Sequence, residues 1–391
     1  MRPTHPLYTG MPTTIFEVMS RLAIEHEAVN LGQGFPDVDG PREVRQAAAD
    51  ALMEGPNQYP PMMGLPELRQ AVADSERRFF GIEREAGDVL ITSGATEALS
   101  DALMAVVEPG DEVVVFDPCY DCYVPLIRRA GGVPKVIPLS PPDWSFSDAD
   151  LDAAFSEKTK TILINNPHNP ASKVFSRNEL ERVAAKLVAC DAYAICDEVY
   201  EHLVFGDAEH IPLCTLTGMA DRTVRVGSAG KTFSLTGWKV GYITGPQALL
   251  QPIAKAHQFT TFTTPPHLQK AVAFGLGLSD GYFHELADDL AAKRNRLAEG
   301  LAAIGFPTLQ ADGSYFLIAD IGQLGLGSDV EAAQRMTVEA GVTTVPMSAF
   351  YQGEAPSHLL RFCFCKRDEV LDEAVTRLKA WRERGFKAAA S

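Results

Sequence analysis

The segment Ser228-Ala-Gly-Lys-Thr-Phe-Ser-Leu-Thr-Gly-Trp-Lys-Val-Gly-Tyr242 decides how this chain is interpreted. The apolar run just before it, residues 223–226, predicts a strand, so the segment begins at the end of a strand. It places Lys231 among small and hydroxyl-bearing residues, with a second cation, Lys239, further along. A lysine in this setting can hold a phosphate as a point charge, or its amine can form a Schiff base with a carbonyl group.

A nucleotide-binding P-loop is the first interpretation to test. It requires the pattern Gly-x-x-x-x-Gly-Lys-[Ser/Thr]. Gly230, Lys231 and Thr232 supply its end, but its first glycine would have to stand where the chain has Arg225. The P-loop therefore fails, and the Schiff-base interpretation is favoured.

The composition predicts an ordinary globular protein with more than one domain. The chain has 391 residues, of which 46% are hydrophobic and 22% charged, whereas a single core rarely grows beyond about 250–300 residues. A net charge of −16 without long basic runs argues against nucleic-acid binding. Seven cysteines without a dense spacing predict a reducing cytoplasm and no metal site. The absence of a long apolar run predicts no membrane segment.

Strand-like and helical patterns alternate along most of the chain. This order predicts a mostly parallel α/β sheet with helices on both faces. Beyond an amphipathic helix at 286–305, further strands and a last helix at 368–382 predict a smaller α+β domain. We expect an N-terminal arm at 1–40 that joins the small domain, a large domain at 41–285 and the small domain at 286–391. The expected strands are 89–92, 112–116, 161–165, 193–196, 223–226 and 240–244 in the large domain, and 315–320, 342–345 and 359–365 in the small one.

Polar residues follow several of these strands, at the edge of the sheet where ligands of α/β proteins bind. Gly94, Ala95 and Thr96 begin a helix after the first strand, and their backbone N–H groups can hold a phosphate or merely start the helix. Asn165 and Asn169 lie in an Asn-Pro turn that can aim them at a ligand, although a plain turn is the alternative.

Asp197 stands at the end of another apolar strand, with Tyr200 close behind. A carboxylate buried there is costly unless it has a partner, and a protonated pyridine nitrogen is such a partner. A helix N-cap is the alternative role for this aspartate.

Together, in order and spacing, these motifs resemble the class I/II aminotransferases of fold type I, which bind pyridoxal 5′-phosphate. The resemblance covers nearly the whole chain and includes a late arginine, Arg361. The segments 31–37, 57–59, 197–201, 228–241 and 361–364 look most like the branch with kynurenine/glutamine transaminases and bacterial methionine aminotransferases. The resemblance implies that Lys231 is the catalytic lysine and holds the cofactor covalently.

The resemblance assigns roles to the remaining residues. Arg361 would bind the substrate α-carboxylate as a bidentate fork, assisted by Asn165 and the Gly34 N–H. Tyr59 would reach the phosphate of a neighbouring subunit, which implies a homodimer with shared sites. Phe16 and Phe262 fall at positions of the side-chain pocket, although core packing is an alternative for both. Cofactor contacts are implied for Gly94, Ala95, Thr96, Tyr120, Asn169, Asp197, Tyr200, Ser228, Lys231, Lys239 and Tyr59.

The chain is thus predicted to be a pyridoxal-phosphate-dependent aminotransferase that moves the amino group of a neutral or apolar L-amino acid to a 2-oxo acid by a ping-pong mechanism. Methionine, glutamine, aromatic and kynurenine-like donors fit this expectation. Kynurenine/glutamine transaminases tend to have Trp at the position of Phe16 and Phe-His where this chain has Phe262-Thr263, so the methionine-type members look nearer. A lyase that cleaves cysteine S-conjugates is the alternative. A regulator that senses the cofactor is a remote alternative, and it would need an added DNA-binding domain. An inactive homologue would have lost residues at the cofactor-binding positions, whereas this chain has the expected residue at each of them.

Overall fold

The structure is a computed structural model that describes residue 2 and residues 4–387. Its larger part contains β2 (Val89–Thr92), β3 (Glu112–Asp117), β4 (Val133–Pro138), β5 (Thr159–Asn165), β6 (Tyr193–Asp197), β7 (Thr223–Ser228) and β8 (Gly241–Thr244). They form one seven-stranded sheet in the order β2-β8-β7-β6-β5-β3-β4. Only β8 runs antiparallel to its neighbours β2 and β7. The chain therefore has the α/β fold and the mostly parallel sheet that its sequence predicts.

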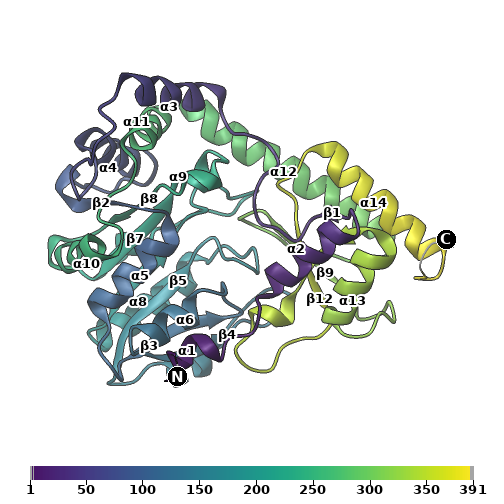
Figure 1. Cartoon of the computed structure of the whole chain (residues 1–391). Helices are drawn as coiled ribbons and strands as arrows, with labels where there is room; N and C mark the ends of the chain where they lie inside the picture. The colour runs from purple at the N-terminus through teal and green to yellow at the C-terminus, as the bar shows by residue number, and fades with distance from the viewer. Residues whose placement is uncertain (1, 3, 388–391) are drawn as a thin grey trace.

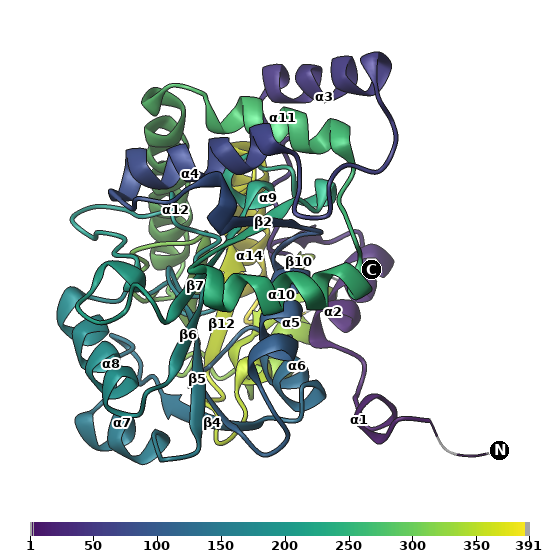
Figure 2. The same ribbon diagram turned by 90° about the vertical axis from the view of Figure 1, so that its left-hand side faces the viewer.

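Helices cover both faces of this sheet (Figure 1 and Figure 2). Val113 and Val115 of β3 pack toward one set of helices, and Val114 between them packs toward the other, because side chains alternate along a strand. The first set is α5 (Ala95–Val106), α6 (Tyr123–Arg129) and α10 (Gln247–Thr260), and the second is α7 (Asp148–Ala154) and α8 (Arg177–Ala189). The helices α3 (Arg42–Glu54), α4 (Pro66–Phe80) and α11 (Pro266–Leu276) pack around β2 and β8.

The smaller part is built around two short sheets. One has β9 (Phe316–Asp320), β11 (Val345–Pro346) and β12 (Leu359–Cys363), with β12 antiparallel to both others. The second pairs β1 (Val29–Asn30) with β10 (Val342–Thr343) in parallel, so the N-terminal segment adds a strand to the C-terminal part. They pack with α2 (Ile15–Glu25), α12 (Asp280–Ala303), α13 (Asp329–Arg335) and α14 (Asp368–Glu383). Two further helices, α1 (Pro6–Thr9) and α9 (Ala229–Thr232), are short.

Two differences from the expected elements have physical causes. The sequence analysis missed β4, an edge strand with only one fully buried residue, Ile137, and with two prolines and a lysine in it. The helix expected at 286–305 starts earlier, at Asp280, behind Ser279 as its N-cap. It buries the stripe Phe283, Leu290, Leu297 and Leu301. The limits of the domains at residues 40 and 285 stay a prediction. No described helix combines the length and the apolar character needed to span a membrane.

Candidate active site

Residues at the carboxyl ends of β5, β6 and β7 line one cavity together with residues of β9 and β12. The lining residues come from both the larger and the smaller part of the chain, so the cavity lies between them. Figure 1 shows β9 and β12 of the smaller part and the large sheet that carries β5 and β7. Most of the residues selected from the sequence meet there, although they come from distant segments. They are Phe16, Gly34, Gly94, Ala95, Thr96, Tyr120, Asn165, Asn169, Asp197, Tyr200, Ser228, Lys231, Lys239 and Arg361.

Tyr59 and Phe262 do not line the cavity of their own chain. Both are exposed, by 84% and 41%, and their rings meet edge to face with centroids 5.8 Å apart. Phe262 has a positive φ of 73°, which turns the chain at the end of α10. A single subunit thus leaves both side chains at its surface and outside its own cavity.

Lys231 lies on α9, the single helical turn that follows β7. Its Nζ donates a hydrogen bond to the Tyr315 hydroxyl at 2.5 Å and approaches the Gly34 carbonyl oxygen at 3.4 Å. Burial lowers the pKa of Lys231 from its ordinary value. A lower pKa raises the fraction of neutral amine, which is the form that acts as a nucleophile or a base.

Asp197 is a buried carboxylate with one free oxygen. The Tyr123 hydroxyl donates to its Oδ2 at 2.5 Å, whereas Oδ1 has no hydrogen-bond partner in the described part of the chain. Burial raises the pKa of Asp197 to about 6, although the Tyr123 hydroxyl opposes this rise. No helix begins directly after β6, so Asp197 is not the helix cap that the sequence left open. A buried unpaired oxygen in a cavity calls for a donor or a cation from a ligand.

An anion site lies at the start of α5. Gly94 is the N-cap residue and has a φ of 82°, which favours glycine. A Cβ at Gly94 would come within 3.5 Å of the Lys239 Nζ, so the ammonium group lies directly against this turn. The N–H groups of the first turn, the helix dipole and the cation together favour a phosphate.

Arg361 is a buried cation, only 1% exposed, that lacks an ion pair among the described residues. Its Nη1 donates to the Asn169 Oδ1 at 2.7 Å, and its Nη2 to the Gly32 carbonyl oxygen at 3.2 Å, while Nε has no partner there. Burial lowers the pKa of Arg361 to about 10. A guanidinium held this way fits an anionic ligand such as a carboxylate.

The Asn-Pro turn after β5 supports this arginine. The Asn165 Nδ2 donates to the Asp197 carbonyl oxygen at 2.8 Å, and its Oδ1 accepts from the Asn169 N–H at 2.6 Å. Asn169, which the sequence suggested as a cofactor contact, uses its side-chain oxygen to orient Arg361. The turn thus links the end of β6 to the guanidinium.

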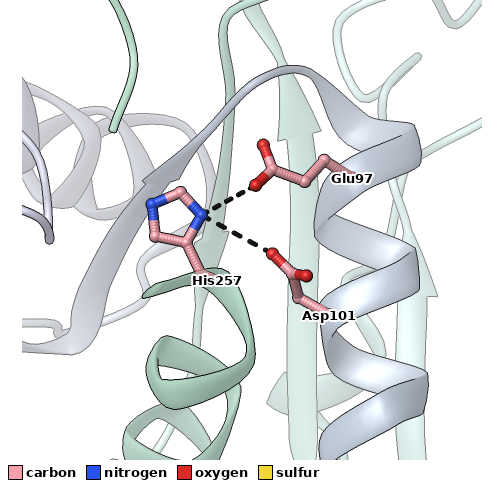
Figure 3. Close-up of side chains that lie close together, drawn as sticks. All are labelled: Glu97, Asp101 and His257. Atoms are coloured by element: carbon pink, nitrogen blue, oxygen red, sulfur yellow. Dashed lines mark hydrogen bonds and ion pairs between the residues drawn. The ribbon is translucent and has the colours of Figure 1, made fainter. Parts of the chain in front are cut away.

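Glu97, Asp101 and His257 form a buried ion cluster (Figure 3). It lies next to the turn at Gly94 where the phosphate would bind, which we call the phosphate turn. The Nδ1 of His257 lies 2.8 Å from the Glu97 Oε1 and 3.6 Å from the Asp101 Oδ2. Burial by itself would lower the pKa of His257, but its hydrogen bonds to Asp101 and Glu97 raise it to about 9. Glu97 in turn accepts a hydrogen bond from the Ser93 N–H, so the charged histidine helps to hold the turn before Gly94.

Sequence reasoning missed several side chains of this site. Tyr123 begins α6 beside Tyr120, and its spacing in the segment 117–123 was the one available signal. Tyr315 reaches Lys231 from the distant start of β9, for which no local pattern exists. Asp121 and Gln33 also line the cavity.

This donor set fits pyridoxal phosphate, the cofactor expected from the sequence. The unpaired Asp197 oxygen suits a protonated ring nitrogen, and the Gly94 turn with Lys239 suits the phosphate. Lys231, with its lowered pKa, suits covalent attachment.

Comparison with known proteins identifies the family. The sequence profile of "Aminotransferase class I and II" matches residues 26–378. The probable N-succinyldiaminopimelate aminotransferase DapC of Mycobacterium tuberculosis is 44% identical over 95% of this chain and 97% of its own. The methionine aminotransferase of Escherichia coli is 39% identical over 94% and 95%, and the kynurenine–oxoglutarate transaminase 3 of Rattus norvegicus 36% over 96% and 89%.

Solved structures agree with this assignment. The structure of N-succinyldiaminopimelate aminotransferase from Mycobacterium tuberculosis matches with a TM-score of 0.94 and 43% identity, over 97% of this chain and 100% of the other. YbdL of Escherichia coli, described as having a methionine aminotransferase function, matches with a TM-score of 0.94, 38% identity and the same coverage. The chain belongs to the class I and II aminotransferases, enzymes of fold type I whose cofactor is pyridoxal phosphate.

Proposed function

We propose that this aminotransferase takes the amino group of a neutral L-amino acid, such as methionine, glutamine or an aromatic amino acid, and transfers it to a 2-oxo acid by a ping-pong mechanism. The observation that carries the proposal is the set of cations in the cavity. Among the described lining residues these are Lys231, Lys239 and Arg361, and each has a use at the cofactor or the α-carboxylate. No cation of this chain is left there for a second carboxylate, whose burial would cost several kcal/mol (about 3 or more) without a partner.

The residues have distinct tasks in this reaction. Bound pyridoxal phosphate supplies an electron-accepting ring for the electron pair released at the substrate Cα. Arg361 holds the α-carboxylate and thereby orients the Cα–H bond. Burial lowers the pKa of Lys231, which favours the neutral amine that takes the Cα proton on its Nζ, and the Tyr315 hydroxyl accepts a hydrogen bond from that nitrogen. Asp197 would pair with the protonated ring nitrogen of the cofactor through its free Oδ1.

We also propose a homodimer in which Tyr59 and Phe262 reach the site of the partner subunit. Both are exposed and packed together at the surface. Two exposed aromatic side chains side by side are typical of an interface. The seven cysteines are all free, which suits the cytoplasmic location that we propose. The domain limits at residues 40 and 285 are part of the same proposal.

The relative from Mycobacterium tuberculosis raises a second candidate donor, N-succinyldiaminopimelate. Such a donor carries further carboxylates, and no cation among the described lining residues of this chain remains to pair with them. Cleavage of cysteine S-conjugates remains the alternative reaction, because it uses the same lysine and the same loss of the Cα proton.

A screen of single half-reactions tests these possibilities. The enzyme loaded with pyridoxal phosphate is mixed with methionine, glutamine, phenylalanine, kynurenine, aspartate and N-succinyldiaminopimelate, and the conversion to the pyridoxamine form is followed by absorbance. We expect kcat/KM for the best neutral donor to exceed that for aspartate by about 100-fold or more. Aspartate or the succinylated donor as best substrate would contradict the proposal. Release of pyruvate and a thiol from an added cysteine S-conjugate, without an oxo-acid acceptor, would identify the lyase.

A further inference from the structure

One charged residue of the cavity has no task in the reaction described above. Asp121 follows Tyr120 in the segment between β3 and α6 and lines the cavity together with Phe16 and Arg361. Its side chain is half-buried. Within the described chain, it forms no ion pair and no hydrogen bond with another side chain, and only the Cys122 N–H supports it. A carboxylate that the fold leaves unpaired in a substrate cavity is available to a ligand.

Arg361 is a cation whose charge acts on Asp121, but its hydrogen bonds go to other groups. Burial raises the pKa of Asp121, and the charge of Arg361 opposes this rise, so the two groups interact across the cavity. The Arg361 guanidinium donates its hydrogen bonds to Asn169 and Gly32, and a substrate α-carboxylate would take most of its remaining charge. Once an α-carboxylate is bound, Asp121 has no cation of its own.

Several other lining residues of the cavity carry no charge. Thr14 and Phe16 at the start of α2, and Gln33 and Phe35 after β1, are all neutral. The two lysines of the cavity lie at the phosphate turn and at the end of β7, where the cofactor would occupy them. Asp121 is therefore the one charged residue among the described lining residues that neither the cofactor nor the α-carboxylate would engage.

We propose that Asp121 is the specificity-determining residue of this enzyme. Its carboxylate excludes donors whose side chain is anionic and favours neutral side chains, in particular those that end in an N–H donor such as an amide. The inference rests on the proposed function and deepens it, because it names the group that produces the preference. The physical cause is Coulomb repulsion in a half-buried site, where two like charges interact far more strongly than in water.

The test compares three donors in the half-reaction with the wild-type holoenzyme and with Asp121→Asn. Methionine is the neutral reference, glutamine adds an amide, and homocysteate carries a sulfonate that stays ionised at every usable pH. We expect the homocysteate-to-methionine ratio of kcat/KM to rise by about 10- to 100-fold in Asp121→Asn. The increase should appear mainly in KM, since the substitution leaves the reacting centre unchanged.

A matched control is Asp191→Asn. The side chain of Asp191 is 94% exposed, and the residue lies before β6, at the opposite end of that strand from Asp197. The substitution Asp191→Asn therefore removes the same charge far from the cavity. The homocysteate-to-methionine ratio of kcat/KM in Asp191→Asn should stay within about twofold of the wild-type ratio, as expected for a distant exposed charge. If Asp121→Asn binds the cofactor poorly, Asp121→Ser provides the same neutralisation. Competitive inhibition of the unchanged enzyme by glutarate and by hexanoate provides an independent measurement, with glutarate expected to bind at least 10-fold more weakly.

Three results would overturn the inference. They are an unchanged donor ratio in Asp121→Asn, an equal loss for all three donors, and equal inhibition by glutarate and hexanoate. An equal loss would mean that Asp121 acts on the α-carboxylate through Arg361 rather than on the side chain. Failure of the proposed function has a different signature, because it appears in the wild type as a preference for acidic donors. A wild type that prefers methionine with an unchanged ratio in the variant contradicts only the role of Asp121.

Discussion

Replacing Asp197 by asparagine should stabilise the apoenzyme while it destroys activity. Burial raises the pKa of Asp197 from its ordinary 3.8 to about 6. A pKa difference of one is worth about 1.4 kcal/mol, so the ionised carboxylate destabilises the folded apoenzyme by about 3 kcal/mol. Asparagine keeps an oxygen that accepts the hydrogen bond of Tyr123 but carries no charge.

The sign of the pH dependence follows from the raised pKa. The wild type has its full stability below pH 3.8, where Asp197 is protonated in both states, and loses about 3 kcal/mol as the pH rises through about 6. The advantage of Asp197→Asn is therefore about 3 kcal/mol at pH 8 and about half of that at pH 5. In a chain of this size, 3 kcal/mol corresponds to about 3–6 °C in Tm.

Thermal unfolding of the apoproteins at pH 5 and pH 8 measures this difference, with Asp191→Asn as the control for the loss of an exposed charge. Adding pyridoxal phosphate should raise the Tm of the wild type more than that of the variant, because only the wild type pairs the ring nitrogen with a carboxylate. The rate of transamination should fall by several orders of magnitude (about 10³ or more). An apo Tm at pH 8 no higher than that of the wild type would refute the reasoning.

Three further predictions concern other parts of the site. Borohydride reduction followed by peptide mapping should place the pyridoxyl group on Lys231, and a label on another lysine would refute this assignment. Arg361→Lys should lower kcat/KM by about 100-fold for every donor, because an ammonium group cannot bind a carboxylate as a fork; near-normal kinetics would argue against the contact. For His257, with a pKa raised to about 9, stability relative to His257→Gln should be greatest below pH 6.5 and decline as the pH approaches 9, as measured by denaturant unfolding. A pH-independent difference would show that its charge is not involved.

Much of the large sheet could be predicted from local patterns. The strand expected at 89–92 is β2, and those expected at 112–116 and 193–196 are each one residue short of β3 and β6. Buried strands are continuous apolar runs, and this signal does not depend on distant contacts. The edge strand β4 escaped detection because its exposed side chains produce no such run.

The residues of the candidate site also fall into two groups, those that the sequence could predict and those that only the structure could place. The sequence by itself determined the family, the α/β fold, and most of the residues that line the cavity, because these follow the carboxyl ends of strands and carry motifs of fixed spacing. Only the tertiary structure placed Tyr315 against Lys231, Tyr123 against Asp197 and Asp121 in the cavity. It also left Tyr59 and Phe262 at the surface. The physical reason is that spacing along a chain specifies which residues share an element, whereas hydrogen bonds and charge pairing depend on how remote elements pack.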